Sequence, residues 1–479
     1  MHTDAKGGNM AVDAELLRKI DEWMTANMDE FLKDIISLVK IRSVGEKRGI
    51  HNAPYGEGCR RALDTALRIC DRMGFATTDY DGYCGTALIK GKEEKQMGIF
   101  THLDIVPEGQ GWSFDPFAPF VSDGFIFGRG ALDNKGAAVA TMYTMKCMQD
   151  LGIKLKNSVL LFFGCNEESG MEDVAYYFKR QQLPAFSFTA DSDFSVCNSE
   201  YGILSLELEL DVGGSALVDF YGGKAPNMVP DSAAAILKGT DFDAAKKKLA
   251  GYENITVEKN EEGVKISASG KTSHVAFPEG SVNAIWVIAQ ALNEQGMAEG
   301  KLRNAMCCIE TALGDCYGKG LGIDDNGETG KVTHTGGLIS LRGEKLILNV
   351  NIRYASNIVQ EKMLAAIGNL VAGYGGKLHV ISNDPPMYIP ADTPLIQELN
   401  GICNDILSTD YKPHDTRGGT YARKIPNAIG YGPNIGTDTN PFEPGKGSGH
   451  QPDEVMRIKN LTNAIKIYVF GLMAIDKHI

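Results

Sequence analysis

The chain has 479 residues, which at roughly 150 residues per domain is enough for two or three compact units. It carries 48 Lys and Arg against 61 Asp and Glu, and the resulting net charge of −13 repels the phosphates of nucleic acids and anionic lipids. Hydrophobic residues make up 43% and charged residues 23%, a balance that is typical of a folded globular protein and excludes a disordered chain. We therefore expect no nucleic-acid partner.

The sequence also indicates where the protein resides. No stretch approaches the roughly 18 apolar residues of a membrane span, and the opening MHTDAKGGNM lacks the apolar core of a secretory signal. The ten cysteines are scattered and include no Cys-x-x-Cys motif, so we interpret them as reduced thiols rather than as zinc ligands or redox pairs. A cytoplasmic protein without membrane contact is expected.

The first part of the chain, taken as residues 10–200, alternates predicted helices with predicted strands. Apolar spacing predicts helices over 13–39, 57–73, 136–151 and 173–182, and strands over 86–90, 97–100, 159–163 and 186–189. This alternation predicts an α/β domain with a mixed, mostly parallel sheet that helices cover on both faces.

The pattern changes over residues 201–383. Alternating strands are predicted over 204–210 and 346–354, a hairpin over 255–269, and helices over 243–249 and 283–293. We expect an inserted α+β lid domain here, built of one or two subdomains. From 384 to 479 a helix (395–407), a short strand (428–432) and a last helix (457–474) complete the α/β domain.

Side chains able to carry chemistry stand at the ends of the predicted strands of the α/β domain. After strand 97–100 come His102 and Asp104, after strand 159–163 come Glu167 and Glu168, and after strand 186–189 comes Asp191. Ligands of an open parallel sheet bind at the carboxyl ends of its strands, so these segments should converge. Asp133, in the loop before the helix over 136–151, can reach the same edge.

Such a crevice would gather more carboxylates than can stay ionised without compensating cations. Histidine and carboxylate ligands without cysteine suit catalytic zinc, cobalt or manganese. We expect two divalent cations, zinc first, with manganese or cobalt as alternatives. The predicted ligands are His102, Asp133 and Asp191 for one cation, and Asp133, Glu168 and His450, from the glycine-rich loop before the last helix, for the other.

The remaining residues of this group suggest supporting roles. Asp104 lies two residues beyond His102, on the same side of an extended chain, and is placed to accept the second N–H of the imidazole. Neighbouring Glu167 and Glu168 point in different directions, so only one of them should bind a cation. We assign Glu168 to the metal and Glu167 to the bridging water as its general base.

Five segments resemble, in the same order, the metal-site motifs of the di-zinc metallopeptidases related to aminoacylase, acetylornithine deacetylase and glutamate carboxypeptidase. They are THLDIVP, GRGALDNKG, NEESG, TADSDF and GSGHQPDE. The resemblance runs from about residue 13 to the end and is strongest to the PepV-type bacterial dipeptidases, through GWSFDPF, GGKAPNMVP, GKTSHVAFPEG and RGGTYAR. It implies the same five ligands, Asp104 as orienter, Glu167 as base and a cis bond between Asp133 and Asn134.

The resemblance also implies residues that the strand-end argument does not reach. His274 would stabilise the oxyanion, and Asn227 and Arg353 would contact the substrate, Arg353 through its terminal carboxylate. Gly418, Gly419 and Arg423 would line the same pocket. PepV-type enzymes have a doubled lid where relatives have a dimer partner, so the resemblance implies a monomer.

The resulting hypothesis is a metal-dependent dipeptidase in which a metal-bridging hydroxide attacks the peptide carbonyl and Glu167 moves the proton. The alternatives are an N-acyl amino acid amidohydrolase of the deacetylase or desuccinylase type, and a non-catalytic peptide-binding protein. Simpler interpretations of single residues also stay open at this stage. Asp133 could cap a helix, His274 could be a surface histidine, Arg353 could form a surface ion pair, and Glu167-Glu168 could be a solvated turn.

Overall fold

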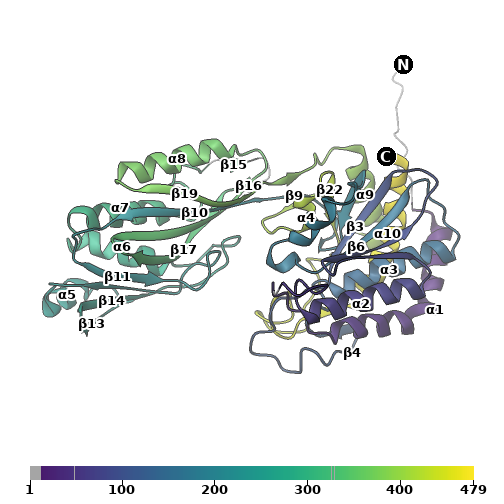
Figure 1. The fold of residues 1–479 in the computed structure, drawn as a ribbon, viewed down its shortest axis with the longest axis horizontal. Helices are drawn as coiled ribbons and strands as arrows, with labels where there is room; N and C mark the ends of the chain where they lie inside the picture. The colour runs from purple at the N-terminus through teal and green to yellow at the C-terminus, as the bar shows by residue number, and fades with distance from the viewer. Residues whose placement is uncertain (1–11, 48, 325, 328–329) are drawn as a thin grey trace, which may run out of the picture. The chain divides into compact units, whose positions relative to one another are not determined.

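The computed structural model describes residues 12–47, 49–324, 326–327 and 330–479. The chain forms two compact units (Figure 1). Unit 1 comprises Met1–Asn198, Ile389–Asp415 and Gly419–Ile479, and unit 2 comprises Ser199–Tyr388 and Thr416–Gly418. For comparison with these units, the boundaries predicted from the sequence lie at 200/201 and 383/384. Residues 10 and 11 of the first predicted segment lie outside the described residues.

The main sheet of unit 1 has four parallel strands at its centre. Its strand order is β1 (Ala76–Tyr80), β2 (Cys84–Ile89), β6 (Ser158–Gly164), β3 (Gln96–His102), β7 (Phe186–Thr189), β22 (Ala428–Tyr431) and β9 (Val196–Glu200). Strands β6, β3, β7 and β22 run parallel, whereas β1, β2 and β9 are antiparallel to their neighbours. Every residue of β6 is buried, as expected for a strand covered on both faces. The predicted mixed sheet is confirmed.

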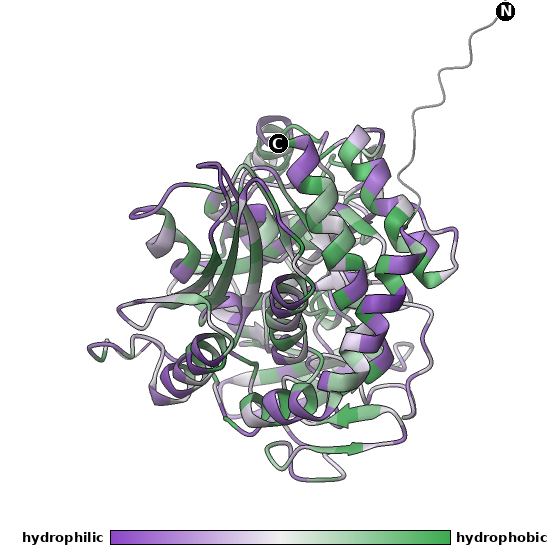
Figure 2. Ribbon diagram, turned by 90° about the vertical axis from the view of Figure 1, so that its right-hand side faces the viewer, coloured by the Kyte–Doolittle hydropathy of each residue, from purple (hydrophilic) through white to green (hydrophobic). Residues whose placement is uncertain are grey.

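Helices cover this sheet, and most of them begin and end where the sequence predicts. They are α1 (Ala14–Val39), α2 (Glu57–Arg72), α3 (Lys135–Asp150), α4 (Glu172–Phe178), α9 (Pro394–Leu407) and α10 (Ile458–His478). Figure 2 shows hydrophobic and hydrophilic residues alternating around the helical turns, the pattern of amphipathic helices. Helix α4 ends before the predicted residue 182 because residues 179–183 are exposed and offer no apolar face that would stabilise another turn.

Short elements complete unit 1 around the edge of the sheet. Strands β4 (Phe120–Ser122), β5 (Phe125–Phe127) and β24 (Val455–Arg457) form a small antiparallel sheet, and β8 (Ser192–Asp193) pairs with β23 (Pro433–Asn434). The turns η1 (Glu167–Ser169) and η2 (Tyr421–Lys424) are single 3₁₀ turns. The β5/β24 pairing joins the chain before Asp133 to the chain after His450.

Unit 2 is an eight-stranded antiparallel sheet with helices on one face. The strand order is β13 (Ile255–Asn260), β14 (Gly263–Ser269), β12 (Ser232–Leu237), β11 (Leu217–Gly222), β17 (Thr333–Arg342), β18 (Lys345–Tyr354), β10 (Gly202–Asp211) and β19 (Lys377–Asp384). The helices are α5 (Phe242–Leu249), α6 (Ala284–Glu294), α7 (Gly300–Leu313) and α8 (Gln360–Gly373). Along β10 buried and half-buried residues alternate, so one face of the sheet lies in the core.

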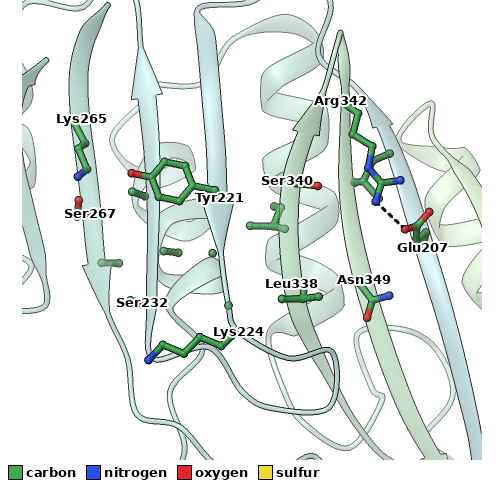
Figure 3. A pocket seen from close by; sticks show the side chains of 17 residues that line it. Glu207, Tyr221, Lys224, Ser232, Lys265, Ser267, Leu338, Ser340, Arg342 and Asn349 are labelled. Atoms are coloured by element: carbon green, nitrogen blue, oxygen red, sulfur yellow. Dashed lines mark hydrogen bonds and ion pairs between the residues drawn. The ribbon is translucent and has the colours of Figure 1, made fainter. Parts of the chain in front are cut away.

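The face of this sheet away from the helices carries both polar and apolar side chains. It holds an open hollow of about 620 Å³, into which Tyr221, Lys265 and Arg342 project (Figure 3). Arg342 is paired there with Glu207, at 3.1 Å between Nη2 and Oε1.

Helices α7 and α8 were not predicted; α8 carries Gly368 and Gly373, which weaken the helical signal of the sequence. Within the described ranges, no helix is both long and apolar enough to cross a membrane.

Candidate metal centre

The parallel register of three strands brings the predicted site residues to one edge of the unit 1 sheet. His102, the last residue of β3, lies opposite Gly164 at the end of β6, and Phe100 lies opposite Thr189 at the end of β7. The segments that follow β6 and β7, with Glu167, Glu168 and Asp191, therefore leave the sheet beside His102. Asp133 reaches the same edge from the loop before α3.

The five predicted ligands lie together in this structure. The Nε2 atom of His102 is 3.0 Å from Oδ1 of Asp133 and 3.5 Å from Oδ2 of Asp191. The Nε2 atom of His450 is 3.1 Å from Oδ2 of Asp133 and 3.0 Å from Oε2 of Glu168. Asp133 therefore presents one carboxylate oxygen to each histidine, which is the arrangement of a bridging ligand.

These separations fit the coordination of metal ions. Two ligands of a tetrahedral zinc ion with bonds of about 2.0 to 2.1 Å stand about 3.3 Å apart, close to the nitrogen–oxygen distances at both histidines. Ligand atoms of His102, Asp133 and Glu168 lie within 4.8 Å of one another, and so do those of His102, Glu167 and Asp191. Glu167, predicted as a base, thus stands as close to His102 and Asp191 as a ligand would.

The electrostatics of the cluster show an excess of buried negative charge. Burial raises the pKa of Glu167 well above its usual range, raises that of Glu168 to about 7, and raises that of Asp191. Hydrogen bonds to Asp133 and then Glu168 raise the pKa of His450 to about 11. Divalent cations bound among these groups would supply the compensating positive charge.

Burial and hydrogen bonding act in opposite directions on the pKa of His102. Burial lowers its pKa, but hydrogen bonds to Asp104, Asp133 and Asp191 outweigh this effect and hold the pKa well above its usual value. Asp133 is the counterpart, because burial raises its pKa while the hydrogen bonds from His102 and His450 bring it below its usual range. The donor set of two histidines and three carboxylates is therefore suited to two dications.

Asp104 orients the site in a way that differs in part from the prediction. The Nδ1 atom of His102 lies 3.0 Å from the main-chain oxygen of Asp104, nearer than the 3.5 Å to its carboxylate Oδ1. The Asp104 carboxylate also accepts hydrogen bonds from the main-chain N–H groups of Glu167 and Glu168, at 3.2 and 3.1 Å. One buried aspartate thus supports both the imidazole and the following acidic turn.

Glu167 and Glu168 have different environments, as expected from their adjacent positions. Glu168 faces His450, whereas Oε1 of Glu167 is buried and has no hydrogen-bond partner among the described residues. A buried carboxylate oxygen without a donor is unfavourable in a resting protein and typical of a functional group. The buried setting excludes the alternative of a solvated acidic turn.

Asp133 does not cap the helix that follows it, so that alternative is wrong. The N-cap of α3 is Asn134, which makes no side-chain cap hydrogen bond. The Nδ2 of Asn134 instead donates to the main-chain oxygen of Ala190 at 2.6 Å and to Oδ1 of Asp191 at 3.1 Å. The Asp133-Asn134 peptide bond is cis, as the resemblance implied.

Two buried supports of the site were not found from the sequence. Asp173 accepts hydrogen bonds from the main-chain N–H groups of Cys165 and Asn166, at 2.7 and 2.9 Å, and from the hydroxyl of Tyr421. Glu454 and Arg129 form a buried ion pair beneath the Asp133 loop. Their partners lie up to 325 residues apart, and no local pattern could have revealed these contacts.

In unit 2, two of the predicted substrate contacts lie together. The Nε2 atom of His274 is 3.3 Å from Nδ2 of Asn227, and the main-chain N–H of Ala276 donates to Nδ1 of His274 at 3.2 Å. Nδ1 is thus an acceptor, which in a neutral ring leaves the proton on Nε2, and the Asn227 amide must turn its oxygen to that nitrogen to accept it. Arg353 lies on β18 and is only 6% exposed, so it is not the surface ion pair considered as an alternative.

The remaining predicted pocket residues divide between the units. Gly418 belongs to unit 2, where its N–H donates to Oγ1 of Thr416 at 3.2 Å. Gly419 and Arg423 belong to unit 1, and a Cβ added to Gly419 would lie 1.8 Å from Cζ of Arg423. Glycine at 419 is what allows the guanidinium of Arg423 to lie against the main chain.

A mixed α/β sheet whose strand ends gather histidines and carboxylates around Asp133 defines a metal-dependent hydrolase of the exopeptidase type. Comparison with known families agrees, since the family described as Peptidase family M20/M25/M40 matches residues 98–473. The chain belongs to this family and is a metallopeptidase.

Individual relatives cover nearly the whole chain. The protein named "Putative dipeptidase YtjP" from Bacillus subtilis (strain 168) is 28% identical over 464 residues, covering 94% of this chain and 98% of that protein. Among solved structures, human carnosine dipeptidase 1 is similar with a TM-score of 0.56 and 13% identity, covering 96% of this chain and 100% of that one. The dipeptidase Dug1p from Saccharomyces cerevisiae is similar with a TM-score of 0.55 and 11% identity, covering 98% and 99%. These structures share the fold.

Proposed function

We infer that this protein is a metal-dependent dipeptidase that hydrolyses short peptides with a free carboxyl end. The observation that carries this inference is the pairing of Asp133, which has one oxygen toward each histidine, with the unpartnered buried Oε1 of Glu167. The dipeptidase names of the relatives support the substrate class. Family membership supports peptide-bond hydrolysis.

In this proposal the five ligands are distributed between two cations as the sequence predicts. His102, Asp133 and Asp191 would hold one divalent cation, and Asp133, Glu168 and His450 the other. Zinc is the first candidate for both, with manganese or cobalt as alternatives. Such cations, when bound, make a water proton labile near neutral pH and polarise the substrate carbonyl.

Side chains of this chain perform the proton transfers and hold the substrate. Glu167 takes a proton from the attacking water at its carboxylate and delivers it to the leaving amine; its raised pKa, caused by burial, suits a group that holds a proton between two steps. From unit 2, His274 is proposed to donate from Nε2 to the oxyanion, and Asn227 and Arg353 to contact the substrate. Gly418, Gly419 and Arg423 are proposed to line the pocket.

The assignment of Glu167 is tested by Glu167→Gln. Loss of a general base lowers kcat by about 10²- to 10⁴-fold, while two metal ions per chain should remain, because Glu167 is not a proposed ligand. Metal content is measured by elemental analysis after removal of free metal, alongside turnover of Ala-Ala. Glu172→Gln is the matched control, since this nearby glutamate is 53% exposed and pairs with Lys47. Unchanged turnover in Glu167→Gln would refute its role.

The substrate class has its own test. Metal-loaded protein should cleave Ala-Ala and related dipeptides, whereas N-acetyl-alanine should be a poor substrate. Cleavage of N-acyl amino acids alone would contradict the dipeptidase proposal and favour the amidohydrolase alternative. Absence of turnover on both, together with peptide binding, would favour a non-catalytic binding protein.

We further propose a monomer located in the cytoplasm. All ten cysteines are free thiols and eight of them are buried, which suits a reducing compartment. The monomer rests on the resemblance to PepV-type enzymes, and sedimentation of the purified protein tests it.

A further inference from the structure

The loop that carries Asp133 is held by one buried side chain, Glu454. Its Oε1 accepts hydrogen bonds from the main-chain N–H groups of Gly130, Leu132 and Asp133, at 2.9, 2.9 and 3.1 Å. Its Oε2 is paired with Nη1 of Arg129. Glu454 is 0% exposed and Arg129 1% exposed, so both side chains lie in the interior of unit 1.

Glu454 also belongs to the loop that carries His450. Three residues separate the two, and the segment between them is held by Asp453, which accepts from the N–H and hydroxyl of Ser113 at 2.6 and 2.8 Å. The main-chain oxygen of Glu454 accepts from the N–H of Gly128 at 3.0 Å, next to the β5/β24 pairing. The carboxylate therefore joins two loops that are far apart in sequence and that carry Asp133 and His450.

This link matters because Asp133 has little positional freedom. Its two oxygens face different histidines at 3.0 and 3.1 Å, and a binding site of this kind tolerates displacements of only about 0.5 Å. Three main-chain N–H groups converging on one carboxylate oxygen form a strong, charge-assisted anchor for the loop. No other side chain among the described residues bonds the main chain of Asp133.

We propose that Glu454 is a positioning residue of the metal centre, which sets the bridging carboxylate of Asp133 and ties it to His450. The proposal rests on the proposed two-cation site. Glu454 touches neither cation nor substrate, and acts by holding the main chain from which Asp133 projects. Its removal should weaken the cation shared by Asp133, Glu168 and His450 before it unfolds the protein.

The test is Glu454→Gln, studied through binding of Co²⁺. An amide at this position has one oxygen, which accepts, and one NH₂ group, which donates. Arg129 and the three main-chain N–H groups are all donors, so one of these two sets of partners must face the NH₂ group and loses its acceptor. Removal of a supporting partner behind metal ligands lowers metal affinity by about 10- to 100-fold. We expect Co²⁺ titration to show two equivalents for the unchanged protein, and one tight and one weakened equivalent for Glu454→Gln, with an altered visible absorption spectrum.

Asp476→Asn is the matched control. Asp476 is also a buried carboxylate that accepts main-chain N–H bonds, from Lys156 and Asn157 at 2.9 and 2.8 Å. It lies near the start of β6, about 20 Å along that strand from the end that carries the site. Both variants should lower Tm, but only Glu454→Gln should alter the Co²⁺ stoichiometry and spectrum.

The outcomes separate this inference from the proposed function. Two tight Co²⁺ equivalents and an unchanged spectrum in Glu454→Gln would overturn the positioning role, and so would equal losses in both variants. Fewer than two equivalents in the unchanged protein would instead overturn the two-cation site itself. If Glu454→Gln does not fold, the measurement is made on Glu454→Asp, whose carboxylate is one methylene short and should still weaken the second equivalent.

Discussion

At the scale of single residues, the buried ionisable groups outside the metal centre set how stability depends on pH. His334, on β17, is 2% exposed, and neither ring nitrogen makes a hydrogen bond within the described residues. Burial lowers its pKa to about 4, although the nearby Asp315 acts in the opposite direction. The unfolded chain takes up a proton on this ring below an ordinary pKa of about 6.5, whereas the folded protein stays neutral until about pH 4.

The contribution of His334 to the free energy of unfolding should therefore have its full value above pH 6.5 and decrease as the pH drops from 6.5 to 4. Between pH 7 and pH 5 the contribution of this one group is about 2 kcal/mol. His334→Leu should remove that difference, as measured by urea unfolding at the two pH values. His379→Gln, at a histidine whose side chain is 46% exposed, is the control and should leave the difference in place. An equal pH dependence in His334→Leu would contradict the assignment.

At the scale of elements, helix starts in unit 2 differ in how they are anchored. Oδ1 of Asn283 accepts from the N–H groups of Ile285 and Trp286 at 2.9 and 3.3 Å, and its Nδ2 donates to the main-chain oxygen of Gly336 on β17 at 3.1 Å. The N-cap of α5, Asp241, accepts only from Ala244, at 2.8 Å. Asn283 thus caps α6 and also ties it to the sheet.

This difference predicts unequal effects of removing the two caps. Asp241→Ala should destabilise α5 by about 1 kcal/mol, the usual effect of a lost N-cap. Asn283→Ala should destabilise α6 by about 2 kcal/mol, because a partly buried hydrogen bond is lost as well. Native-state hydrogen exchange of the amides of each helix measures both values. Equal losses would mean that the bond to Gly336 contributes little.

At the scale of the whole molecule, all five proposed metal ligands belong to unit 1. A ligand that binds only the folded state stabilises it, by about 2.7 kcal/mol when present at 100 times its Kd. Zinc should therefore slow hydrogen exchange in the strands and helices of unit 1, and a chelator should reverse this effect. The amides of unit 2 should not respond, and they serve as the internal control. A response of equal size in both units would argue against a centre confined to unit 1.

Sequence patterns predict most of unit 1 because the residue pattern of each strand or helix shows which of its faces are buried. The apolar runs before His102, Glu167 and Asp191 are strands buried on both faces, and polar residues that directly follow such strands stand out. Helix α1 begins after Asp13, whose carboxylate accepts from the N–H groups of Glu15 and Leu16. Periodicity and capping act within a few residues, so they can be seen in the chain itself.

By itself, the sequence thus determined the types of secondary structure, the segments that carry possible metal ligands and, through its ordered motifs, a family resemblance. The tertiary structure alone decided that Asp133 turns one oxygen to each histidine, that Asp104 supports His102 mainly through its main chain, and that Glu454 holds the Asp133 loop. The contacts of Asp133 with the two histidines and of Glu454 with the Asp133 loop join residues far apart in the chain. They depend on strand order and register, which arise from packing of the whole sheet and leave no local periodic trace.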